Sequence, residues 1–386
     1  MLCGVNYGQS IAFHTKPAQV LSHSVAAGIF SKIAKGDMPT GAVATVLIDG
    51  HFRNLAWNGG PMHVQCEHGL DVWMKTGQYT KENVIATKAF IFQDEVYVIT
   101  PRMKTGILAT LWLIVQEKNG VELQPFPELR THKQGDCSGI QNAVDFYLDH
   151  FSKLWILDSG VVDTLTAPKC TCPPKVIVIS MVLGKLVKII DISSAWEPNS
   201  LLQNIVIEHT LAGKTFIYIS DASRGAILVL EVGSGSEWPV VVCSPAPGLQ
   251  IALVKQPTHS VLIVVRLHYH GIIELDTAAL RRKDSVAPLT IFGEHSKPVV
   301  LLGTYGHNVF FRHTECSDVL VWDMRLAYNS SRLDNIHSAG PRLTTTAVAA
   351  IPFKPVLLVL DSNYLDTLHG SSSTYHKITF ITNYRF

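Results

Sequence analysis

One short pattern recurs six times in this chain, and it restricts the fold more than any other feature. In each copy a loop leads into an apolar strand with an aromatic or aliphatic centre, and a polar residue closes the strand. The centres of successive copies lie between 45 and 63 residues apart. The copies are Val96–Thr100, Leu154–Asp158, Ile217–Asp221, Leu262–Arg266, Val309–His313 and Leu357–Asp361.

Several copies continue through a turn into a further apolar strand, as at Ala226–Leu230, Ile272–Leu275 and Val319–Trp322. A period near 50 residues with several strands in each unit is typical of a β-propeller, whose sheets pack radially around a channel. We therefore predict an all-β, six-bladed β-propeller over residues 51–386, preceded by an atypical N-terminal segment, residues 1–50. A β-sandwich with coincidental spacing is the alternative.

The composition excludes several classes of protein. Charged residues are 16% of the chain and apolar residues are 47%, whereas a disordered chain needs low hydrophobicity and a high net charge. The 32 basic and 31 acidic residues nearly cancel and form no basic block, so we expect no nucleic-acid partner. No apolar stretch reaches the ~20 residues that span a bilayer, so no membrane span is predicted.

The polar residues that end the six strands form the first candidate site. If the strands are equivalent, these residues lie at one level near one rim of the channel, where mixed charges suit a small ligand. The alternative is that they cap strand ends and bind the backbone of turns. The six residues are Thr100, Asp158, Asp221, Arg266, His313 and Asp361.

The aromatic centres of the repeats, Tyr97, Trp155, Tyr218 and Phe310, are interpreted as core residues rather than as a ligand wall. His268-Tyr269-His270 would place two imidazoles on one side of a strand, since side chains alternate. A shared metal there is less favoured than two hydrogen-bonded or solvated histidines, so we predict no metal site.

No sequence motif of a known nucleophile or phosphate-binding loop is present, and no cofactor is predicted. The G-x-S-x-G, H-E-x-x-H and P-loop patterns are absent. Asp158, Asp221 and Asp361 could supply paired carboxylates for acid–base catalysis if the channel buries them. Ion pairing with Arg266 and His313 is the alternative for these carboxylates.

Several of the same segments resemble the insect Yellow / major royal jelly protein family. The resemblance extends from about Leu55 to about His369, and it implies a six-bladed propeller and a secreted protein. The matching stretches are Pro101–Leu111, Gly135–Cys137, Leu154–Gly160, Cys172–Lys175 and Tyr218–Asp221. Within the family the chain is most similar to the eggshell-associated Yellow-g type, through Asn83–Thr87, Val161–Leu165 and Phe310–Arg312.

Both ends of the chain depart from the family. Residues 1–50 do not resemble its signal peptide and lead-in, and a truncated or misassembled start is our preferred explanation. The tail after His369 also fits poorly. Because a propeller usually closes by pairing strands from opposite ends of the chain, the strand that completes the last blade is not predicted.

The resemblance also bears on covalent features. Cys137 and Cys172 stand at family motif positions, and the implied secretion favours a disulfide between them over two free thiols. Cys66 and Cys243 are a weaker second pair. Asn329-Ser330-Ser331 is an N-x-S/T sequon and hence a glycosylation candidate in a secreted chain.

Two functions follow from the resemblance. The first is a non-enzymatic extracellular protein of the eggshell or cuticle, with matrix proteins as partners and a small aromatic amine in the channel. Its ligand residues would be the six strand-end residues and Arg102. The second is an enzyme that converts dopachrome-type catechol quinones, with Asp158, Asp221, His313 and Arg102 as acid–base candidates. A calcium-dependent lactonase-like propeller is a third reading, but no EF-hand loop appears.

Overall fold

The computed structural model describes residues 47–48, 51–63, 67–256, 259–282, 290–294, 297–351, 354–368, 373–382 and 384. These residues belong to one compact unit, Val43–Phe386. The predicted N-terminal segment, residues 1–50, therefore lies outside the described residues except for Leu47 and Ile48.

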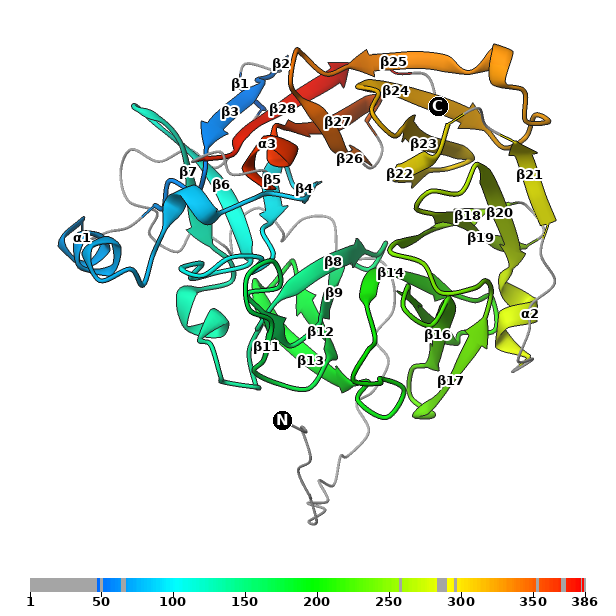
Figure 1. Cartoon of the computed structure of the whole chain (residues 1–386), viewed down its shortest axis with the longest axis horizontal. Helices are drawn as coiled ribbons and strands as arrows, with labels where there is room; N and C mark the ends of the chain where they lie inside the picture. Colours follow the sequence, from blue (N-terminus) through cyan, green and yellow to red (C-terminus); the bar gives the residue numbers. More distant parts are fainter. Residues whose placement is uncertain are drawn as a thin grey trace, which may run out of the picture. The chain divides into compact units, whose positions relative to one another are not determined.

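Six four-stranded antiparallel sheets form the blades of a propeller, which confirms the predicted fold class (Figure 1). Blade one contains β4 (Lys88–Phe92), β5 (Glu95–Ile99), β6 (Leu111–Glu117) and β7 (Gly120–Pro125). Blade two contains β8 (Ala143–Leu148), β9 (Lys153–Asp158), β12 (Lys175–Ser180) and β13 (Lys185–Asp191). Blade three contains β14 (Leu202–His209), β15 (Thr215–Asp221), β16 (Ala226–Glu231) and β17 (Ser236–Val241).

The remaining blades follow the same order. Blade four contains β18 (Leu249–Lys255), β19 (Ser260–Arg266), β20 (Gly271–Asp276) and β21 (Thr290–Glu294). Blade five contains β22 (Val299–Tyr305), β23 (Asn308–His313), β24 (Asp318–Asp323) and β25 (Asp334–Ser338). Blade six contains β26 (Thr344–Ala350), β27 (Val356–Ser362), β28 (Tyr375–Thr382) and β3 (Leu55–Asn58).

Short elements connect or flank the blades. Two small hairpins are formed by β1 (Leu47–Ile48) with β2 (His51–Phe52), and by β10 (Val161–Val162) with β11 (Lys169–Cys170). The α-helices are α1 (Glu67–Lys75), α2 (Thr277–Arg281) and α3 (Tyr364–Leu368). The 3₁₀ turns are η1 (Lys81–Asn83), η2 (Leu129–His132) and η3 (Ser330–Arg332).

The six repeat copies are the second strands of their blades, not the strands at the axis. They are β5, β9, β15, β19, β23 and β27, and each lies between a first strand and a third strand. A strand in the middle of a blade is covered on both faces by neighbouring blades, so it is apolar on both faces. Every residue of β27 is buried for this reason. The predicted core residues Tyr97, Trp155, Tyr218 and Phe310 are all buried.

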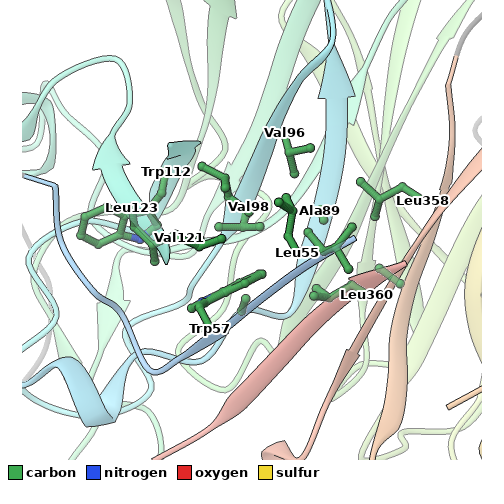
Figure 2. Close-up of a cluster of buried hydrophobic side chains, with 14 of the residues drawn as sticks. Leu55, Trp57, Ala89, Val96, Val98, Trp112, Val121, Leu123, Leu358 and Leu360 are labelled. Atoms are coloured by element: carbon green, nitrogen blue, oxygen red, sulfur yellow. The ribbon is translucent and has the colours of Figure 1, made fainter. Parts of the chain in front are cut away.

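The ring closes through β3, which is the outermost strand of blade six although it precedes blade one in the chain. Leu55 pairs with Ile378 of β28, and Asn58 pairs with Tyr375. Figure 2 shows Leu55 and Trp57 among buried side chains of blade one and of β27. The hydrophobic cluster therefore joins the first and the last blade, and this pairing answers which strand completes the ring.

Candidate functional site

A central cavity of about 900 Å³ is enclosed by the first strands of all six blades. These strands, β4, β8, β14, β18, β22 and β26, surround the axis in Figure 1. A cavity of this size is large enough for a drug-sized ligand. We refer to it as the channel.

The channel has two distinguishable ends. It extends to the turns that join first strands to second strands, including Gln93–Asp94, Asp149–Ser152 and Tyr305–Gly306. We call this end the hairpin face. The other end is marked by Lys88 and Asp145, which stand near the beginnings of β4 and β8, and we call it the deep end.

A polar network crosses the first strands at the deep end. The Lys88 Nζ atom lies 3.4 Å from Asp145 Oδ1. Asp145 Oδ2 accepts hydrogen bonds from Asn204 Nδ2 at 2.9 Å and from the Ile205 N–H at 3.0 Å. Asn204 Oδ1 accepts in turn from the Ile251 N–H at 3.3 Å. Four blades are thereby joined through side chains, and the edge N–H groups of two first strands are satisfied.

The same kind of link continues to blade five. Gln250 of β18 accepts a hydrogen bond from the Leu301 N–H of β22 at 2.9 Å, and its amide nitrogen donates to the Leu301 carbonyl at 3.3 Å. The Thr304 hydroxyl donates to the Leu253 carbonyl at 3.1 Å. First strands of adjacent blades do not share a sheet, so these side chains replace ladder hydrogen bonds between them.

Asp149 is the most heavily bonded carboxylate at the hairpin face. It accepts from the N–H groups of Phe151 and Lys153 at 2.8 and 2.9 Å, and from Trp155 Nε1 at 2.8 Å. His209 Nε2 lies 3.1 Å from its Oδ2 atom. Burial lowers the pKa of His209, and the hydrogen bond to Asp149 opposes this shift. Asp149 therefore holds the turn after β8 against β14.

Aromatic rings and balanced charges line the rest of the channel. The ring centroids of Phe90 and Phe146 lie 4.6 Å apart. Tyr147 is the next aromatic residue of β8, and burial raises the pKa of its hydroxyl to about 12. The charged lining consists of three lysines and three aspartates: Lys88, Lys255, Lys354, Asp94, Asp145 and Asp149. Such a lining suits a small aromatic ligand that carries little net charge and several polar atoms.

The predicted strand-end residues lie away from the channel. Five of them lie at the end of a second strand, opposite the hairpin face, and Thr100 directly follows β5. Asp158, for example, pairs with Ala143, and Asp221 with Leu202. None of Thr100, Arg102, Asp158, Asp221, Arg266, His313 and Asp361, all of which the structure describes, lines the channel. Their role in ligand binding stays a prediction.

Asp158 and Asp221 bind the backbone of loops, whereas Asp361 binds side chains of neighbouring strands. Asp158 accepts from the N–H groups of Gln141, Asn142 and Gly160 at 2.8, 2.8 and 3.0 Å. Its Oδ2 atom also lies 3.0 Å from the buried Lys175 Nζ. In the third blade, one carboxylate oxygen of Asp221 accepts from the Leu201 N–H at 2.9 Å and the other from the Ser200 hydroxyl at 2.6 Å. Asp361 accepts from the Thr345 hydroxyl at 2.7 Å and lies 2.8 Å from His337 Nε2.

Arg102 joins loops of blade one to the segment that precedes blade two. Its guanidinium donates to the carbonyls of Ile107, Leu108 and His132 at 2.8, 2.7 and 2.7 Å, and also to the Gln141 carbonyl. Burial lowers its pKa to about 10, opposed by the charges of Asp158 and Asp163. All these acceptors are backbone carbonyls, so the side chain holds the loops together. Thr100, also buried, accepts from Trp112 Nε1 at 2.7 Å.

The other predicted side chains are only partly buried. Arg266 donates to the Ser244 hydroxyl at 3.0 Å and lies over the ring of Tyr269, 5.4 Å from its centroid. His313 lies beside Phe311, with ring centroids 6.1 Å apart. The expectation that His268 and His270 stand on one strand is wrong. Both lie in the turn between β19 and β20, where His268 has a φ of 66°.

The covalent predictions fare differently. Cys137 and Cys172 form a disulfide with a Cα–Cα distance of 5.5 Å. Cys243 is a free, half-buried cysteine, and Cys66 lies outside the described residues, so the second pair stays a prediction. Asn329 is exposed at the start of η3, where its side chain accepts from the Ser331 N–H at 3.0 Å. Its position is compatible with glycosylation, which stays a prediction.

Sequence reasoning missed the polar residues of the channel, because it looked for the site at the residues that end the second strands. A usable signal was present in blade two, where Ala143-Val144-Asp145-Phe146 places one carboxylate inside an otherwise apolar strand. A buried aspartate in such a strand needs partners, and a propeller axis supplies them from the neighbouring blades.

Among the described residues, no helix has the length and apolar character to cross a membrane. The fold and channel together define a six-bladed propeller with an axial cavity of ligand size. Residues 141–247 match the family model of the major royal jelly proteins. This match and the relatives that follow support the assignment of the chain to the Yellow / major royal jelly protein family.

Three relatives share parts of the chain. Major royal jelly protein 7 of Apis mellifera is 30% identical over 147 residues, which are 36% of this chain and 32% of that protein. Protein yellow of Drosophila melanogaster is 27% identical over 143 residues, 36% of this chain and 26% of that protein. Dopaminechrome tautomerase of Drosophila melanogaster is 20% identical over 313 residues, 68% of this chain and 65% of that protein.

The chain thus spans between about a quarter and two thirds of the length of these relatives. A solved α-L-arabinofuranosidase from Fusarium graminearum has a TM-score of 0.51, covering 85% of this chain and 97% of that chain at 9% identity. Similarity at this level of identity concerns the fold alone.

Proposed function

We propose that this protein binds a small aromatic amine or catechol derivative in the channel, and that it does so as a secreted, non-enzymatic protein of the Yellow family. The observation that carries the proposal is the lining of the channel, where aromatic rings accompany three lysines and three aspartates. Aromatic faces attract a cationic amine, carboxylates offset its charge, and lysines bind its ring oxygens.

An extracellular role is supported by the disulfide between Cys137 and Cys172, because such bonds persist in oxidising compartments. We propose eggshell or cuticle maturation as the setting, following the Yellow-g resemblance of the sequence, with extracellular matrix proteins as partners. Mass spectrometry of the protein from its native tissue tests this part, through the mature N-terminus and glycosylation at Asn329. Recovery from the cell interior with reduced Cys137 would contradict it.

Calorimetric titration with dopamine, serotonin and octopamine tests ligand binding. We expect saturable binding of at least one amine, weakened at least tenfold by Asp145→Asn. Asp136→Asn is the control, because Asp136 is exposed and bonded only within its own loop. If none of the three amines binds, or if Asp145→Asn binds as tightly as the wild type, the channel is not the amine site.

A tautomerase is the second candidate function, favoured by the match to dopaminechrome tautomerase and by the Lys88–Asp145 pair in the channel. Isomerisation of an aminochrome moves a proton from a ring carbon to an oxygen, with no added reactant. Asp145 could take that proton and Lys88 could donate one to the oxygen. Decay of dopaminechrome absorbance that is lost in Asp145→Asn and kept in Asp136→Asn would favour the enzyme. Binding without faster decay favours the first proposal.

A further inference from the structure

Three metal-binding side chains converge on the outer part of blade one, away from the channel. The His63 Nδ1 atom lies 2.9 Å from Glu122 Oε2 and 3.5 Å from Glu117 Oε1. The three ligand atoms all lie within 4.8 Å of one another. Ligand atoms bound to a tetrahedral metal at 2.0–2.2 Å stand about 3.3 Å apart. The separations of His63 Nδ1 from the two glutamate oxygens lie on either side of that value.

Hydrogen bonding alone does not account for this arrangement. One imidazole nitrogen carries at most one proton, yet two carboxylates approach the same Nδ1 atom of His63. In the part of the chain that the structure describes, neither Glu117 nor Glu122 has a lysine or arginine nitrogen within 4.0 Å. The side chains are only 13–35% exposed, so solvent screens the two negative charges incompletely. A dication would balance both.

The backbone holds the three groups in place from two directions. Glu117 and Glu122 belong to the β6–β7 hairpin, where Gln116 pairs with Val121 and Glu117 with Gly120. His63 follows β3 and is held against β7, since its N–H donates to the Leu123 carbonyl at 2.9 Å. The three ligand atoms therefore need little rearrangement to bind an ion.

We propose that His63, Glu117 and Glu122 bind a divalent transition-metal ion that fastens the ring-closing segment of the propeller. Imidazole with two carboxylates suits Zn²⁺ and also Mn²⁺. Three protein ligands leave a further position for water or another group. The ion would connect the chain just after β3, the last strand of blade six, to the hairpin of blade one, so binding stabilises the closed ring.

Titration of the EDTA-treated full chain with zinc chloride, and in parallel with manganese chloride, tests the site. We expect one ion per chain at this site and a rise in Tm on binding. Glu117→Gln and Glu122→Gln should each weaken binding at least tenfold and abolish the rise in Tm. Glu128→Gln is the matched control, because Glu128 is an exposed carboxylate paired with Arg130 and should leave binding unchanged.

Cobalt substitution makes the test independent of stability. Bound Co²⁺ should show visible absorption that changes in Glu122→Gln, and circular dichroism in EDTA reports whether each variant is folded. The proposal is overturned if the wild type binds neither zinc nor manganese saturably. It is also overturned if the folded Glu117→Gln and Glu122→Gln variants bind zinc as tightly as the wild type.

Discussion

The Nζ atom of Lys88 lies 3.4 Å from Oδ1 of Asp145, and this contact joins the first strands of blades one and two inside the channel. Asp145 is 6% exposed and Lys88 is 25% exposed, so the carboxylate is the more deeply buried partner. A buried carboxylate is costly unless ion pairs and hydrogen bonds compensate it. Asp145 therefore holds neighbouring blades together and also lines the channel.

Removal of this carboxylate should destabilise the propeller. Asp145→Ala deletes the ion pair and leaves the Ile205 N–H without its acceptor, so we expect a loss of about 3 kcal/mol in the free energy of unfolding. Asp94→Ala is the control, because Asp94 and its partner Lys354 are 30% and 38% exposed and should contribute under about 1 kcal/mol. Urea denaturation measures both, and equal losses would contradict the role given to Asp145.

Substitution of two glycines that have a left-handed backbone distinguishes the cost of backbone strain from the cost of a steric clash. Gly160 has a φ of +67°, and an added Cβ would lie 2.0 Å from the Cys172 carbonyl oxygen. Gly213 has a φ of +76° with nothing within 4 Å of an added Cβ. We expect Gly213→Ala to lower the free energy of unfolding by about 1 kcal/mol and Gly160→Ala to lower it by about 3 kcal/mol. The loss is larger at Gly160 because the added Cβ must also displace the backbone of Cys172. Similar unfolding free energies for the two variants would refute this reading.

The disulfide should contribute strongly to stability. Cys137 and Cys172 are separated by 35 residues, and the chain-entropy model assigns a loop of that length about 4 kcal/mol. We expect Cys137→Ser to lower the free energy of unfolding by that order and to remove its sensitivity to reductant. Cys316→Ser serves as control, because Cys316 is a free, half-buried cysteine that takes no part in the bond. A wild-type protein equally stable with and without dithiothreitol would count against this prediction.

Acid should destabilise the fold before most carboxylates are protonated. Burial lowers the pKa of His132 and of His376 to about 3, from 6.5. Below pH 6.5 the unfolded chain binds protons at these imidazoles and the folded chain does not, so stability falls from pH 6.5 down to about pH 3. Each group contributes a slope of about 1.4 kcal/mol per pH unit where it is protonated only in the unfolded chain.

The variant His376→Gln tests this linkage. Glutamine retains an acceptor for the Ala86 N–H, which donates to His376 Nε2 at 2.9 Å, but it cannot be protonated. Denaturation between pH 6.5 and pH 5 should show a shallower dependence of stability on pH than in the wild type. An unchanged slope would mean that His376 is also protonated in the folded protein.

The sequence predicted the second strands well because their signal is local. Residues such as Tyr218 and Phe310 stand in runs that are apolar on both faces, and burial between two blades requires that composition. The residues that end these strands, such as Asp158 and Asp221, pair with the beginnings of the first strands. Their distance from the axis was misjudged, because a run of residues does not reveal how many strands separate it from the channel.

The site and the ring closure depend on contacts distant in sequence. Leu55 meets Ile378 only when the first and last blades come together, and β3 is too short to be recognised as part of blade six. Lys88, Asp145 and Asn204 lie on three different blades, and their separations in sequence carry no motif.

The sequence alone predicted six sheets and their buried strands, and the family resemblance implied the pairing of Cys137 with Cys172. The tertiary structure decided which strands face the axis, which polar groups share the channel and which segment closes the ring. The physical reason is that burial of a strand follows from its own side chains. Proximity between blades instead follows from how all six sheets pack around one axis.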